Sequence, residues 1–157
     1  MPSETLLLGI AQIAVVIAGF TAVTAALTPP GGSWSPGHRL RQRAIVSTSF
    51  NVVFEALLPL ILFAWLAVAH DALVLASGAV AIYATWVVVM RARQLDRLGV
   101  LRTRGMIPIL LAGPVACALF ALNALVFVSV GVYALALCVQ LLVPVISFYT
   151  LVSASSS

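Results

Sequence analysis

Charged side chains are scarce in this sequence. Only 8% of its 157 residues carry a formal charge and 63% are hydrophobic, whereas soluble globular proteins contain about 25% charged residues. This shortage argues against a soluble enzyme or binding domain, which would need a polar surface. Hydrocarbon suits an apolar surface when the backbone polar groups are bonded within helices. The composition therefore predicts an all-α, polytopic transmembrane helical bundle that forms one unit over residues 1–153.

Lysine is absent, and the formal net charge of +4 comes from eight arginines and four acidic residues. A basic chain can bind nucleic acid when its cationic side chains line one exposed surface. Here the arginines stand in two short clusters, at 39–43 and 91–104, between long apolar runs. Membrane topology explains this placement better. We therefore expect membrane lipids, and no nucleic acid, among the partners.

Cysteine is rare, and the motifs of several enzyme classes are missing. Cys117 and Cys138 lie inside apolar runs, with no CxxC spacing and no neighbouring histidine, so they indicate neither a metal site nor a disulfide. There is no GxSxG, no HExxH and no glycine-rich phosphate loop. We expect no catalytic residue, cofactor or metal, and an intramembrane enzyme is the least favoured class.

Five apolar segments approach the length of about 20 residues that a spanning helix needs. The stretch 105–153 contains no charged residue, and as one helix it would be roughly twice as long as a hydrocarbon core of about 30 Å. It must therefore fold back, with a turn expected at 129–131. A four-span arrangement would leave a membrane-length run unassigned and ranks second. The predicted spans are about 5–27, 43–69, 72–92, 106–128 and 132–152, followed by a serine-rich tail at 154–157 that we expect to be disordered.

The arginines predict the orientation. With five spans, all eight fall on one side of the membrane, in the connections after the first and third spans. Cytoplasmic segments carry the excess of arginine and lysine, so the N-terminus is expected outside and the C-terminus in the cytoplasm. Basic segments next to a span also attract anionic lipids. The predicted headgroup contacts are Arg39, Arg43, Arg91, Arg93 and Arg97.

A polar stripe follows the second predicted span. Arg43, Ser47, Asn51, Glu55 and Pro59 recur every four residues, a spacing that places them on one helical face. Glu55 lies about 18 Å beyond Arg43 at about 1.5 Å per residue. The stripe therefore carries a carboxyl group from the cytoplasmic end to the region of the membrane midplane.

Glu55 has two interpretations. A carboxyl group at that depth usually faces the bundle interior or a water-filled cavity, which favours a proton or cation site. A neutral glutamic acid could instead hold two helices together by a hydrogen bond. Pro59 has no N–H and leaves the carbonyl of Glu55 without its helical partner, which distorts the helix near the carboxyl or simply provides a packing kink.

Three further polar residues, Gln12, Asn123 and Gln140, fall in the outer half of the predicted membrane region. They could line a vestibule with Glu55 at its base, or each could form a local interhelical hydrogen bond. On the first span, Ala14, Ala18, Ala22 and Ala26 are spaced by four and predict a packing seam. The predicted ion or proton path comprises Glu55, Asn51, Ser47, Gln12, Asn123 and Gln140.

Most of the chain resembles a broad group of small multi-span bacterial inner-membrane proteins for which no activity is established. The resemblance lies in the AQIAVVIAGF segment at 11–20 and its flanks, and in the Trp34-Ser35-Pro36 segment. It continues through Arg39, Arg43, 47–49, Leu57-Leu58-Pro59, the LNAL segment at 122–125 and the last apolar helix. It implies a multi-span fold and a bacterial inner-membrane location, and it supplies no catalytic residue.

Two functions follow as hypotheses. The first is a channel or transporter-like protein that uses the Glu55 face. Five helices enclose little room for water, so its pore would form between subunits of a homo-oligomer. The alternative is a non-catalytic membrane subunit or scaffold that binds a partner protein or lipid. A hydrated stripe would favour the first, and a stripe sealed in helix packing the second.

Overall fold

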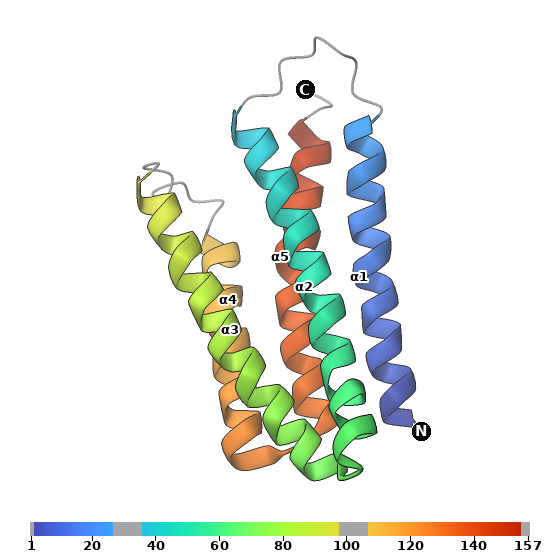
Figure 1. The fold of residues 1–157 in the computed structure, drawn as a ribbon. Helices are drawn as coiled ribbons and strands as arrows, with labels where there is room; N and C mark the ends of the chain where they lie inside the picture. The colour runs from blue at the N-terminus through green and yellow to red at the C-terminus, as the bar shows by residue number, and fades with distance from the viewer. Residues whose placement is uncertain (1, 27–35, 98–106, 155–157) are drawn as a thin grey trace.

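The computed structural model describes residues 2–26, 36–97 and 107–154, and within these ranges every regular element is helical. The predicted all-α bundle is therefore confirmed. Five α-helices and one short π-helical segment follow one another along the chain (Figure 1). They are α1 (Pro2–Ala26), α2 (Pro36–Leu66), α3 (Ala69–Arg97), α4 (Ile107–Leu122), η3 (Asn123–Phe127) and α5 (Val130–Ala154).

Four of these helices are long and apolar enough to cross a membrane, with candidate spans at Glu4–Val23, Gln42–Leu66, Ala69–Gln94 and Val130–Tyr149. The fifth apolar helix, Leu111–Phe127, is shorter. It begins one turn earlier, at Ile107, so α4 and η3 together extend roughly 30 Å at about 1.5 Å per residue. The chain is thus a helical membrane protein. Four of the predicted spans each correspond to one long helix, and the predicted span at 106–128 corresponds to α4 and η3 together.

The helix ends differ from the predicted spans mainly near the arginines. α2 begins at Pro36, so Arg39, Arg41 and Arg43 belong to its first turns and not to a loop. A proline suits a first helical turn because its fixed φ is helical and its missing N–H needs no partner there. α5 continues to Ala154, the first residue of the predicted tail, and 155–157 lie outside the described residues.

The helices run alternately up and down, so the start of α1 and the end of α5 lie at opposite ends of the bundle (Figure 1). α2 and α5 form the centre: α2 contacts α1, α3 and α5, while α5 contacts α1, α2 and α4. α3 pairs with α4 and with the π segment. The start of α2, with Arg39 and Arg43, and the end of α3, with Arg91, Arg93 and Arg97, therefore lie at the same end of the bundle, and Arg102 and Arg104 lie outside the described residues.

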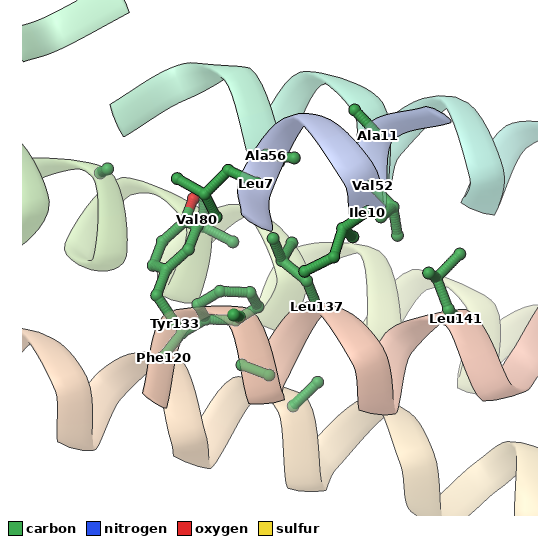
Figure 2. Close-up of a cluster of buried hydrophobic side chains, with 14 of the residues drawn as sticks. Leu7, Ile10, Ala11, Val52, Ala56, Val80, Phe120, Tyr133, Leu137 and Leu141 are labelled. Carbon is green, nitrogen blue, oxygen red and sulfur yellow. The ribbon is translucent and has the colours of Figure 1, made fainter. Parts of the chain in front are cut away.

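The core combines small residues with a few large side chains (Figure 2). Phe120 of α4 and Tyr133 of α5 are fully buried and meet edge to face, with ring centroids 5.1 Å apart. Ala14 and Ala18 face the core as the predicted seam requires, whereas Ala22 is exposed. Small residues allow the close helix approach on which packing in membranes depends.

Gly113 of α4 lies close against the side chain of Val88 on α3. A Cβ atom built on Gly113 would lie 2.7 Å from Cγ2 of Val88, closer than real Cβ contacts. Valine is β-branched and has one strongly preferred rotamer in a helix, so a change of rotamer at Val88 would not easily make room for a Cβ atom. The absence of a side chain at Gly113 therefore allows α4 to lie this close to Val88.

Two short connections join neighbouring helices at the end opposite the arginines (Figure 1). Ala67, between α2 and α3, has a φ of 54°, and its N–H donates to the carbonyl of Phe63 over 2.9 Å. Val128, after η3, has a φ of 44° and donates to the carbonyl of Asn123 over 2.9 Å. The predicted turn at 129–131 is thus present but centred at 128–129.

The outer surface of the bundle is apolar. Many large hydrophobic side chains are exposed on every helix, among them Phe20, Phe54, Trp65, Ile82 and Leu125. Exposed apolar area on this scale marks a surface that does not face water, and hydrocarbon is the solvent that accommodates it.

Candidate functional site

Most of the side-chain hydrogen bonds between helices in the described residues involve the polar stripe of α2 or its neighbour Thr48. The stripe faces α3 near the arginine end of the bundle and α5 deeper inside. Helical spacing brings Ser47, Asn51 and Glu55 to one side of α2, and the partners come from residues more than thirty positions away.

The guanidinium of Arg91 on α3 occupies the upper end of the stripe. Its Nη1 donates to Oγ1 of Thr48 over 2.8 Å, and its Nη2 donates to Oγ of Ser47 over 2.9 Å. The side chain is half-buried. Sequence reasoning assigned Arg91 to lipid headgroups and did not identify Thr48, which lies beside Ser47 and is buried against α3.

Asn51, one turn deeper along the stripe, also accepts a hydrogen bond from α3. The hydroxyl of Tyr83 on α3 donates to Oδ1 of Asn51 over 3.2 Å. Tyr83 also lies against Trp86, with ring centroids 6.3 Å apart. Asn51 is partly buried, and its carbonyl oxygen belongs to the α2–α3 contact.

Glu55 lies deeper still, between α2 and α5, with only 4% of its surface exposed. Nε2 of Gln140 donates to its Oε1 over 3.4 Å, which is long for a hydrogen bond. The other carboxyl oxygen, Oε2, is buried and has no hydrogen-bond partner among the described residues, and the same is true of Oε1 of Gln140. Two acceptor oxygens therefore remain unsatisfied where α2 meets α5.

Pro59 explains a second bond at Glu55. Because proline lacks an N–H, the backbone carbonyl of Glu55 has no donor one turn ahead in α2. The hydroxyl of Tyr133 on α5 donates to this carbonyl over 2.6 Å. Both the side chain and the main chain of Glu55 are thus bonded to α5.

Asn123 and Gln12 do not join this group. Asn123 is fully buried, donates from Nδ2 to Oγ of Ser77 on α3 over 2.9 Å, and accepts from the N–H of Ser129 over 2.9 Å. It therefore holds the turn between η3 and α5 against α3. Gln12 is on an exposed face of α1. Of the predicted path, the structure brings together Glu55 and Gln140.

The predicted headgroup contacts gather at one end of the bundle. Arg43 and Arg93 are exposed, and Arg91 is half-buried. Arg39 and Arg97 belong to α2 and α3, and their side chains lie outside the described ones. Among the described side chains of this set, Arg91 is thus the one held by hydrogen bonds to another helix, through Ser47 and Thr48 of α2.

Metal-binding groups are dispersed in the part of the chain that the structure describes. No three of its His, Cys, Asp and Glu side chains form a cluster that could hold a metal ion. Cys117 is partly buried and Cys138 exposed, and both are free thiols.

No family model, no curated protein and no solved structure matches the chain. The fold and the site therefore define the class of a multi-span helical membrane protein. Its activity has to be inferred from the chemistry of the stripe.

Proposed function

We propose that the protein is a non-catalytic subunit or scaffold of a bacterial inner membrane, with its arginine end in the cytoplasm, which binds a partner protein or lipid. One observation carries this proposal: Ser47, Asn51 and Glu55 of the α2 stripe are each bonded to a neighbouring helix of the same chain. Ser47 and Thr48 accept from Arg91, Asn51 accepts from Tyr83, and Glu55 accepts from Gln140 and Tyr133.

A water-filled path needs polar side chains that face a cavity. Here the deepest member, Glu55, is almost fully buried by protein. Interhelical hydrogen bonds in membranes contribute about 0.6 kcal/mol each on average. Several of them along one helix fix its rotation and neighbours, which suits a rigid element on which other molecules assemble.

The arginine end supports lipid as one bound molecule. A guanidinium has five N–H donors, of which Arg91 uses one on Thr48 and one on Ser47. Arg43 is exposed one turn before Ser47 on the same face of α2. An anionic phospholipid headgroup at this end of the α2–α3 contact would meet both cations.

A second function is favoured by a different observation. Oε2 of Glu55 and Oε1 of Gln140 are buried acceptors without a described partner, and buried polar atoms that lack a partner are often functional. In this alternative the protein is a proton- or cation-conducting homo-oligomer that uses Glu55.

Flux measurements separate the two functions. Native protein, Glu55→Gln and the control Glu4→Gln are reconstituted into liposomes, and proton and potassium flux is followed under an imposed gradient. The scaffold proposal expects the same background flux from all three. Flux through the native protein and Glu4→Gln that is abolished in Glu55→Gln would overturn it and support the transport function.

A further inference from the structure

The unsatisfied atoms at Glu55 and Gln140 belong to two groups of complementary shape. A carboxyl and a primary amide are both planar, and each presents two polar atoms side by side. One half of the contact is formed, since Nε2 of Gln140 donates to Oε1 of Glu55 over 3.4 Å. In the other half, Oε2 of Glu55 and Oε1 of Gln140 are both acceptors, and neither has a partner among the described residues.

A single proton satisfies both atoms. When it is bound to Oε2, the carboxyl O–H donates to Oε1 of Gln140, while Nε2 continues to donate to Oε1 of Glu55. Two hydrogen bonds then close a ring between α2 and α5. Without the proton, a negative charge would lie in a site with 4% exposure, where a buried charge without a counter-charge is costly.

A metal cation fits the same place poorly. Hard cations take about six or more oxygen ligands, and the site offers the two unsatisfied oxygens of Glu55 and Gln140. The hydroxyl of Tyr133 is already directed at the backbone carbonyl of Glu55. No cluster of metal-binding side chains exists among the described residues.

We propose that Glu55 and Gln140 form a proton-binding site, in which the proton on Oε2 of Glu55 is shared with Oε1 of Gln140 and joins α2 to α5. This inference goes beyond the scaffold function and does not depend on whether protons cross the membrane. Loss of the proton breaks one bond of the ring and leaves two facing acceptors, so the α2–α5 contact becomes weaker as pH rises.

Other titratable groups around Glu55 are few. Tyr133 on α5 and Cys117 on α4 interact with it electrostatically. On α3, Tyr83 and Arg91 bond to stripe residues nearer the arginine end. α1 contributes Glu4, which is exposed in the first helical turn.

Infrared spectroscopy of the reconstituted full chain tests the proposal, because a protonated carboxyl has a carbonyl band separate from carboxylate bands. The chain has only four acidic residues, so assignment by substitution is direct. At neutral pH the native protein should show this band, Glu55→Gln should lose it, and Glu4→Gln should keep it. In Gln140→Met the band should persist and move to the higher frequency of a carboxyl without a hydrogen bond.

Thermal unfolding in detergent provides a second measurement. A glutamine at 55 can form the same ring with Gln140, so Glu55→Gln should match the native midpoint at neutral pH and stay unchanged as pH rises, while the native midpoint falls. Absence of the protonated band at neutral pH would overturn the proposal. So would a midpoint that rises with sodium, compared with choline, in the native protein but not in Glu55→Gln.

Discussion

The hydroxyl of Tyr133 on α5 donates a 2.6 Å hydrogen bond to the backbone carbonyl of Glu55 on α2. This is the carbonyl that Pro59 leaves without its usual donor in the helix. The backbone carbonyl that lacks a donor within α2 thus accepts a hydrogen bond from α5 instead. The bond joins the two central helices at the same residue whose side chain meets Gln140.

Replacing Tyr133 with phenylalanine should lower the free energy of unfolding by about 1–2 kcal/mol, because the buried carbonyl of Glu55 loses its donor. Pro59→Ala restores an N–H to α2 and supplies the carbonyl with a helical partner. In a double-mutant cycle, Tyr133→Phe should therefore cost less in the Pro59→Ala background. The free energy of unfolding of all four proteins is measured in mixed micelles. Equal costs in both backgrounds would show that Tyr133 does not compensate for Pro59.

Gly113→Ala should destabilise the α3–α4 contact by about 1–3 kcal/mol, since its Cβ would overlap the stiff side chain of Val88. Gly78→Ala on α3 is the matched control, because a Cβ there meets nothing within 4 Å. That change should be neutral or stabilise by up to about 1 kcal/mol through helix propensity. Thermal midpoints of both variants test the pair, and a neutral Gly113→Ala would refute the close approach.

Arg91→Gln should reduce the stabilisation that phosphatidylglycerol gives over phosphatidylcholine in thermal unfolding with added lipid. Arg91 is held by Ser47 and Thr48 at the end of the α2–α3 contact, where it can meet a headgroup. Arg93→Gln measures how much of the effect any arginine at this end supplies, because Arg93 is exposed on the same helix and is itself a predicted headgroup contact. Added inorganic phosphate distinguishes a headgroup from a free anion. A lipid effect of equal size in native protein and Arg91→Gln would remove Arg91 from the lipid site.

Labelling tests the orientation. In a background with Cys117→Ala and Cys138→Ala, single cysteines are introduced by Ser3→Cys and Ser155→Cys, and intact cells are treated with a membrane-impermeant maleimide. Only Ser3→Cys should react, because the arginine clusters are expected in the cytoplasm. Labelling after lysis provides the control that both positions are accessible. The opposite pattern would reverse the orientation.

The sequence determined the class of the protein and the order of its helices. With 8% charged residues and apolar runs of about 20 residues, the chain suits membrane-spanning helices, whose backbone groups are bonded within each helix. The missing N–H of Pro59 and the four-residue spacing from Ser47 to Glu55 are local properties, and both could be read directly. The start of α2 could not be predicted from the sequence, because the residues around Arg39 suit either a loop or the first turn of a helix.

Tertiary structure decided the partners of the stripe. Arg91 meets Ser47, Tyr133 meets Glu55, and Gln140 meets Glu55 across separations of 44, 78 and 85 residues. Helical periodicity states which face a side chain occupies, but not which helix covers that face. That choice depends on how small residues such as Ala14 and Gly113 allow the helices to approach. For this reason Gln12 and Gln140, the same type of residue, occupy an exposed face and a partly buried interhelical contact.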